Sequence, residues 1–211
     1  MTAITALRSL VITQVPLAND VTIDRILVEV ARDFFEVTRA WRSSVTATVT
    51  ADTLGVTLTP PTDGELVDIV AATLDEVTLV KKTQEQLDAI DPKWRTESQT
   101  SYYITTGDAL NEVLIAPMSA TTFTSGLAAR VAWKPALGAA TLDAVMVSKY
   151  SDALVAGALG KLFMIPGEPY NNVALASYYA GTYEQKRDEA RQSAVDGRMQ
   201  GVVRKVRYGG I

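Results

Sequence analysis

Six charged side chains lie close together near the C-terminal end of the sequence and are the first candidates for chemistry. They are Glu184, Lys186, Arg187, Asp188, Glu189 and Arg191. Paired carboxylates can act as general acid and base or hold a metal ion. On a helix, however, mixed charges three and four residues apart favour ion pairs on a solvated face or between subunits. We therefore interpret this cluster as structural.

The chain contains neither histidine nor cysteine. A Ser-His-Asp triad, a thiolate zinc site, a thiol nucleophile and a disulfide framework are thus excluded within this chain. Carboxylate-only chemistry, or a lysine or tyrosine base, stays open as an alternative. Asp63 and Glu65 flank a turn, where Asp has conformational reasons to occur. We predict that the protein is not an enzyme and has no catalytic residues, no metal site and no cofactor.

Length and composition are typical of one compact folded domain, or of one domain with a sizeable insertion. The 211 residues are 47% hydrophobic and 21% charged, with a formal net charge of −4. An acidic chain of this kind is not expected to bind nucleic acid generally. We expect no signal peptide and no membrane span, because the N-terminal apolar run from Leu10 to Leu17 is short and interrupted. The protein is expected to fold and remain in the cytosol, or in something that is assembled there.

The last eleven residues form a short, glycine-flanked basic segment. Its notable side chains are Arg204, Lys205, Arg207 and Tyr208. The cations are suited to pairing with carboxylates on a partner protein and to becoming ordered on docking. A solvated terminus is the structural alternative. DNA binding is a third reading, but three cations without a supporting fold are a weak signal for it.

Three helices are predicted from apolar periodicity. The first runs from about Asp20 to Arg42, with Asn19 or Asp20 as its cap. The second runs from about Asp143 to Ile165, and a third follows the break at 166–169 and is stopped by Gly197. The expected bundle core comprises Ile23, Leu27, Val30, Phe34, Val37, Trp41, Leu159, Leu162 and Phe163.

Between the first two helices, apolar residues alternate with polar ones, and this period of two predicts strands. Strands are expected at 45–51, 55–59, 65–74, 77–82 and 127–134, with a hairpin of 102–105 and 112–116 and a helical turn at 84–90. The predicted fold class is α+β: a helical bundle from the N-terminal and C-terminal thirds, an inserted β-rich domain and an extended C-terminal tail. Its parts are an N-terminal arm with the first bundle helix (1–42), the β-rich insertion (43–141), the C-terminal bundle helices (142–198) and the tail (199–211).

Trp94 lies in a polar segment after Pro92 and is not easily assigned to a core. Aromatic residues dominate protein–protein hot spots, so Trp94 is a candidate interface anchor. Alternatively, its loop folds back over the sheet.

Several segments in one order resemble the head-to-tail adaptor proteins of bacteriophages, which are related to the tail tubular protein A of T7-like phages. Residues 33–42 (DFFEVTRAWR) are similar to the end of the family's first helix. Residues 150–171 (YSDALVAGALGKLFMIPGEPYN) are similar to its buried helix and following turn. The resemblance covers roughly residues 12–195. Glu168 stands where the family usually has lysine, and Tyr170 where it usually has tryptophan; both are candidate interface residues.

This resemblance implies a structural virion protein located in the viral neck, between capsid and tail. Its subunits would form a dodecameric ring below the portal protein. The ring would offer its other side to the next tail or nozzle protein, and genome DNA would pass through the channel without sequence-specific binding. The basic C-terminal segment would dock on the portal. Alternatives are a tail-completion or terminator ring protein and, from another class, a monomeric binding module.

Overall fold

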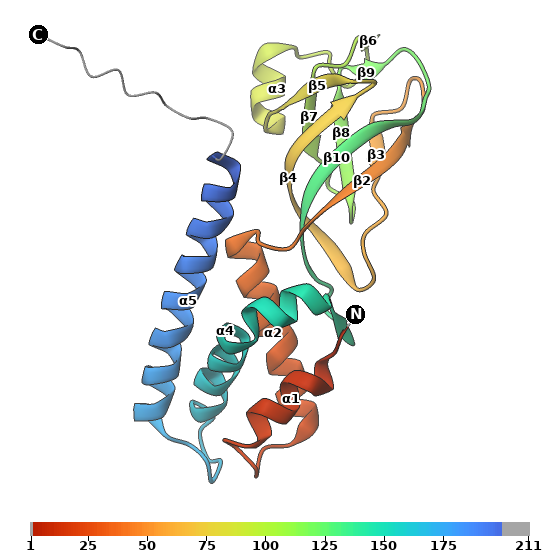
Figure 1. Cartoon of the computed structure of the whole chain (residues 1–211). Helices are drawn as coiled ribbons and strands as arrows, with labels where there is room; N and C mark the ends of the chain where they lie inside the picture. Colours follow the sequence, from red (N-terminus) through yellow and green to blue (C-terminus); the bar gives the residue numbers. More distant parts are fainter. Residues whose placement is uncertain (1, 200–211) are drawn as a thin grey trace, which may run out of the picture.

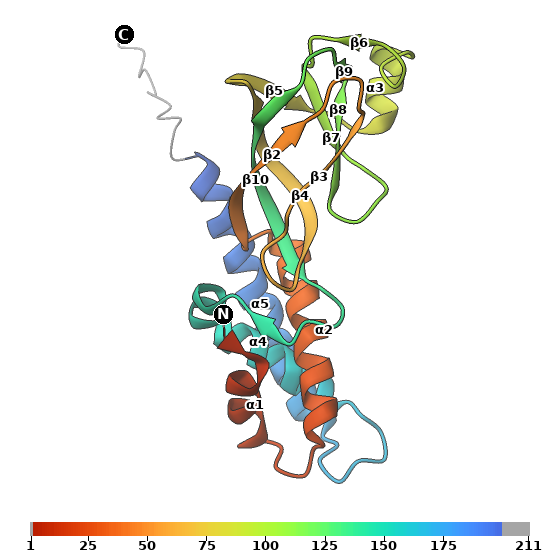
Figure 2. The ribbon, with the colours of Figure 1, turned by 90° about the vertical axis from the view of Figure 1, so that its right-hand side faces the viewer.

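The computed structural model describes residues 2–199, which contain five helices arranged in two groups (Figures 1 and 2). Their bounds are α1 Ile4–Ile12, α2 Asp20–Thr38, α3 Gln84–Ile90, α4 Ala144–Phe163 and α5 Val173–Met199. Four of them pack together at one end of the molecule, whereas α3 lies at the far end beside the strands (Figure 1). No helix within residues 2–199 combines the length and the apolarity needed to cross a bilayer.

Seven strands form one sheet in the order β2-β10-β4-β5-β7-β8-β3. Their bounds are β2 Arg42–Val49, β3 Gly55–Thr57, β4 Gly64–Leu74, β5 Val77–Lys81, β7 Tyr103–Thr106, β8 Glu112–Ala116 and β10 Phe123–Pro135. Neighbours are antiparallel except β5 and β7, which run parallel. Two small sheets pair β1 (Thr2–Ala3) with β11 (Thr141–Leu142) and β6 (Ser98–Gln99) with β9 (Met118–Ser119).

Helix α2 follows from its sequence at both ends. The Asn19 side chain accepts a bond from the Val21 amide and caps the start. Arg39 takes a left-handed conformation at the other end, so the helix stops before the predicted Arg42. The prediction that Val37 lies in the core is wrong, because Val37 is 38% exposed. The other predicted core residues are buried: Ile23, Leu27, Val30, Phe34, Trp41, Leu159, Leu162 and Phe163.

The predicted fold class, a helical bundle carrying an inserted β domain, is wrong. The fold is a mixed α/β structure in which the large sheet and the helices share one hydrophobic core. Helix α2 contacts β10 directly. At the junction, the Trp133 amide donates to the Trp41 carbonyl, and Phe35 meets the Trp41 ring at 6.0 Å between centroids. Large apolar side chains at the ends of α2 and β10 therefore join the helices and the sheet in one core, although the periodicity of the sequence had suggested two separate parts.

The predicted local elements agree with the structure better than the predicted fold class does, with two corrections. Strands β4, β5, β7 and β8 and helix α3 lie close to their expected bounds. Helix α5 continues to Met199 instead of stopping at Gly197. The supposed N-terminal arm contains helix α1, whose Leu7 and Val11 are buried in the main core. Residues 200–211 of the predicted extended tail lie outside the described part of the chain.

The turn before β4 is tied to the segment before α4 by Asp63. Its carboxylate accepts bonds from the Ala140 amide (3.2 Å) and from the amide (3.0 Å) and hydroxyl (2.7 Å) of Thr141. Its φ of 58° is left-handed, a conformation that Asp and Asn tolerate best among residues with a side chain. The Thr141 hydroxyl and these amides lower the pKa of the Asp63 carboxyl below its ordinary value.

We expect Asp63→Ala to lower the free energy of unfolding at pH 7 by about 1–3 kcal/mol, because three donors lose their acceptor. A carboxyl with a lowered folded-state pKa stabilises the protein above its unfolded pKa, and this contribution is lost as the pH falls through the folded value. Urea denaturation at pH 7 and at low pH measures both effects. Asp63→Asn, which keeps one acceptor oxygen and cannot ionise, should flatten the pH dependence; an unchanged pH dependence would contradict the assignment.

Candidate interaction surface

The charged side chains of α5 join helices together in the structure. Lys186 reaches Asp152 of α4 at 3.5 Å, and Arg187 reaches Asp33 of α2 at 3.4 Å. No group of three or more acidic residues within residues 2–199 is placed to hold a metal ion. Of the six residues singled out in the sequence, Lys186 and Arg187 therefore form ion pairs between helices, whereas Glu189 accepts a bond from Gln185 within α5.

The sequence left open a tyrosine that acts as a general base, and Tyr183 is one such residue. In the structure, Tyr183 donates a hydrogen bond. Its hydroxyl donates to the Asp33 carboxylate at 2.6 Å. Burial and the neighbouring Asp33 charge raise the pKa of Tyr183 far above its ordinary value. A phenol in this setting keeps its proton at neutral pH, so Tyr183 positions α5 on α2 and is unsuited to accepting a proton.

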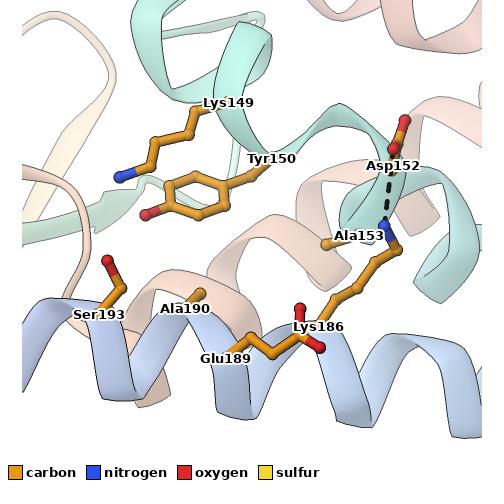
Figure 3. A pocket seen from close by; sticks show the side chains of 8 residues that line it. All are labelled: Lys149, Tyr150, Asp152, Ala153, Lys186, Glu189, Ala190 and Ser193. Carbon is orange, nitrogen blue, oxygen red and sulfur yellow. Dashed lines mark ion pairs between the residues drawn. The ribbon is translucent and has the colours of Figure 1, made fainter.

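A small hollow of about 240 Å³ lies between α4 and α5 (Figure 3). Its wall is formed by Lys149, Tyr150, Asp152, Ala153, Lys186, Glu189, Ala190 and Ser193. Lys186 already pairs with Asp152, and the Lys149 ammonium lies 5.1 Å from the centre of the Tyr150 ring. Positive and negative groups balance in this open hollow, which gives it no preference for an ionic substrate.

A larger, mainly apolar hollow of about 520 Å³ opens where α2, α4 and α5 meet. Its lining residues are Glu29, Val30, Asp33, Gly157, Gly160, Lys161, Met164, Ala180 and Tyr183. Gly157 permits the close approach of the helices, because a Cβ there would lie 2.6 Å from Val30 Cγ1 and 2.8 Å from the Tyr183 ring. The hollow has the size and polarity to take an apolar side chain of a partner.

Apolar side chains gather at the end of the helices furthest from the sheet. The turn from α1 to α2 and the turn from α4 to α5 lie together there in both views (Figures 1 and 2). The exposed residues in and beside these turns are Leu17 (70%), Val21 (75%), Met164 (57%), Val173 (61%) and Tyr178 (66%). We call these five residues the helical end. Isolated exposed apolar residues are common, but five of them in and beside two neighbouring turns make this end a candidate contact surface.

The turn between α4 and α5 contains the predicted interface residues Glu168 and Tyr170. Glu168 is exposed, whereas Tyr170 is half-buried and packs against the main core. Burial, assisted by the Glu168 charge, raises the pKa of the Tyr170 hydroxyl. The structure thus brings both residues to the helical end, where Tyr170 fastens the turn and Glu168 adds a negative charge.

Asn171 holds this turn in shape. Its side-chain amide donates to the carbonyls of Phe163 (3.1 Å) and Ile165 (3.0 Å), the last residues before the turn. These are carbonyls at a helix end, which need a donor from outside the helix. Asn172 then begins α5 by accepting a bond from the Leu175 amide at 3.1 Å.

We expect Asn171→Ala to lower the free energy of unfolding by about 1–2 kcal/mol and to raise amide exchange in residues 164–172. The Ile165 carbonyl loses its side-chain donor, and the Phe163 carbonyl keeps only the Asn172 amide. Asn171→Asp is the matched control: it preserves the size of the side chain but replaces the donor with a repelling acceptor, so it should destabilise at least as much. Chemical denaturation and hydrogen–deuterium exchange provide the measurements. A stability unchanged in both variants would show that the two bonds do not hold the turn.

Trp94, the other proposed interface residue, is not accessible to a partner. It is 1% exposed and packs with Leu87, Leu114 and Ala116 in a second, smaller core. Its indole N–H donates to the Asp88 carboxylate at 2.9 Å. The prediction that Trp94 anchors an interface is therefore wrong. The structure agrees with the alternative, in which the loop of Trp94 folds back over the sheet.

The sequence reasoning missed most of the helical end. Leu17 lies in the turn before α2 and Val21 in the first turn of that helix, and neither falls on the apolar stripe from which the helix was predicted. The proposed docking residues Arg204, Lys205, Arg207 and Tyr208 lie outside the described residues. No model of a known protein family matches the chain, and no curated protein matches it.

Proposed function

We propose that this chain is a structural subunit of a bacteriophage particle, a head-to-tail adaptor of the viral neck. In this proposal, its copies form a dodecameric ring that joins the portal protein to the next tail or nozzle protein. The genome crosses the central channel during ejection without sequence-specific contacts. The resemblance of residues 33–42 and 150–171 to adaptor proteins provides the starting point.

The observation that carries the proposal is the helical end. Leu17, Val21, Met164, Val173 and Tyr178 expose apolar surface at one pole of the chain, and two separate turns contribute to it. Glu168 and Tyr170, the positions where the sequence departs from the family pattern, belong to the same turn. A surface of this kind supports a role in which the chain is covered by another protein.

Helix α5 adds a second feature that fits an assembled protein. Between Val173 and Val195, the fully buried residues are Ala176 and Ala190. The helix lies along one side of the molecule (Figure 1). A long helix that buries so little of itself within its own chain has most of its surface free for a neighbouring copy in a ring.

The chemistry of the described residues agrees with a structural role. Asp33, Tyr183 and Arg187 are engaged with one another, and Lys186 with Asp152. A carboxylate enzyme needs acidic groups that face a pocket free of fixed partners. The hollows of the helical part do not offer such a group, which favours the structural proposal over an enzyme.

Imaging of the infectious particle tests the proposal most directly. Cryo-electron microscopy of the neck should place a twelve-fold ring of this chain between portal and tail. A six-fold ring would instead support the tail-completion alternative, and a particle that lacks the chain at this vertex would reject both. For the portal-docking segment, a chain without residues 201–211 should fail to join heads to tails; joining by that chain would remove the role assigned to Arg204, Lys205, Arg207 and Tyr208.

A further inference from the structure

Helix α2 carries a stripe of charged side chains that meets the large sheet. Arg32, Glu36 and Arg39 are separated by four and then three residues, a spacing that places side chains along one side of a helix. All three form ion pairs with residues of β4 or β10. The helix and the sheet are therefore held together by charges as well as by the apolar contact described above.

The first group of ion pairs involves Glu65 of β4 and Lys134 of β10. These residues lie opposite each other in the sheet, with Lys134 Nζ 3.6 Å from Glu65 Oε1. From the helix, Arg32 Nη1 donates to Glu65 Oε2 at 2.8 Å and to the Pro135 carbonyl at 2.7 Å. Lys134 also donates to Glu36 of the helix at 3.0 Å. The side chains of Arg32 (20%), Glu65 (23%) and Lys134 (14%) are mostly covered, so salt screens these pairs only in part.

The second group is centred on Asp68 of β4, whose side chain is 7% exposed. Its carboxylate pairs with Arg39 Nη1 at 2.5 Å and with the ammonium of Lys81, at the end of β5. Arg39 is the residue that ends α2, and its φ of 51° is uncommon for a residue with a side chain. A carboxylate this deeply buried requires cationic partners. The end of α2 is thus attached to an inner strand of the sheet.

Both carboxylates of β4 have one partner on the helix and another on a neighbouring strand. Glu65 pairs with Arg32 and with Lys134, and Asp68 pairs with Arg39 and with Lys81. Loss of the helix partners would leave each carboxylate with its partner on the strand. The bonds between helix and sheet can therefore break without leaving a buried charge unpaired.

The geometry of the junction makes these bonds important for orientation. The chain passes between the helices and the large sheet through two short segments, residues 39–41 and 136–143. Both views show the helices and the sheet as two groups that meet at this junction (Figures 1 and 2). Apolar contact is non-directional, whereas hydrogen bonds between charged groups have a defined geometry. The ion pairs are thus the contacts best suited to fix the angle between the two groups.

We propose that Arg32, Glu36 and Arg39 form an ionic lock, which holds the large sheet at one angle to the helical part (α1, α2, α4 and α5). Without the lock, the sheet rocks about the junction of Trp41 and Trp133, and the shared core keeps the two parts attached. The lock belongs to the free chain and does not depend on a role in a viral neck.

A distance measurement across the junction tests the lock. Arg32→Gln, Glu36→Gln and Arg39→Gln together remove the helix side of every pair, and glutamine is a good helix former. The absence of native cysteine allows spin labels at Gln185→Cys on α5 and at Ile90→Cys on α3, both exposed positions. Double electron–electron resonance should give a narrow distance distribution in the labelled parent. In the triple variant the distribution should be roughly twofold broader or more.

The matched control changes the same charges away from the sheet. Arg25→Gln, Glu29→Gln and Arg191→Gln alter exposed residues of α2 and α5, and this variant should keep the parental width. A second label pair, Leu17→Cys with Gln185→Cys, lies within the helical part. Its distribution should stay narrow in every variant, because the helices keep their packing.

Arg39→Gln alone provides a milder test. Arg39 is 45% exposed, and Asp68 keeps Lys81, so this variant should fold even if the triple variant does not. Its distribution between α5 and α3 should be broader than that of the parent and narrower than that of a folded triple variant. Parental width in Arg39→Gln and in a folded triple variant overturns the lock. Broadening of the matched control to the same extent overturns it as well.

Discussion

Trp133→Ala is expected to lower the free energy of unfolding by about 3–5 kcal/mol, a larger loss than either Asp63→Ala or Asn171→Ala should cause. Trp133 is fully buried on β10, between β2 and β4. Its indole N–H donates to the Ser43 hydroxyl at 2.7 Å, and its amide donates to the Trp41 carbonyl at 2.8 Å. Truncation to alanine leaves a large cavity at the junction of sheet and helices and leaves the Ser43 hydroxyl without its donor.

The consequences of this substitution distinguish a shared core from two separate ones. If the helices and the sheet share one core, amides of α2 and of β10 should lose protection together, and denaturant unfolding should remain a single transition. Trp133→Phe is the matched control: it keeps most of the apolar volume, loses the indole donor and should cost about 1–2 kcal/mol. Loss of the sheet while α2 stays protected would show that the sheet is an independent unit after all.

The sequence predicted the local elements because their signals are local. Alternation along 65–74 and the apolar stripe from Ile23 to Phe34 depend only on neighbouring residues, and both elements formed as expected. The way these elements combine depends on contacts between residues far apart, such as Trp41 with Trp133. The periodicity of a sequence indicates that such side chains are buried, but it does not indicate which other element packs against them. The fold class was therefore wrong although most elements were right.

The candidate surface was only partly predictable for a related reason. Glu168 and Tyr170 became candidates because their turn differs from the pattern of the adaptor proteins that the sequence resembles. Trp94 was assigned to an interface because its neighbours are polar, yet those neighbours include Asp88, which accepts the indole N–H and makes burial possible. Leu17 and Met164 belong to turns 147 residues apart, and only the packing of α1, α2 and α4 brings these turns to the same pole.

The helical end makes the second large prediction. Met164→Asp with Val173→Asp should leave the stability of the free chain nearly unchanged, because both side chains are more than half exposed (57% and 61%). If the chain assembles into a viral neck as we propose, the same carboxylates would be buried there without partners. A central contact residue contributes roughly 2 kcal/mol or more, so two such changes should weaken association by roughly 1000-fold. Cells supplied with this variant should accumulate heads and tails that remain separate.

The matched control places the same charges on an exposed apolar surface elsewhere. Val77→Asp with Val80→Asp alters two residues of β5 that are 47% and 51% exposed, at the end of the molecule distant from the helical end. This control changes the net charge by the same amount, so a general effect of charge on assembly would appear in both variants. Native mass spectrometry of the purified chains and counts of joined particles supply the readout. Joined particles at parental numbers from the Met164/Val173 variant would mean that no neck partner covers the helical end, since an interface cannot bury two unpaired carboxylates without loss of affinity.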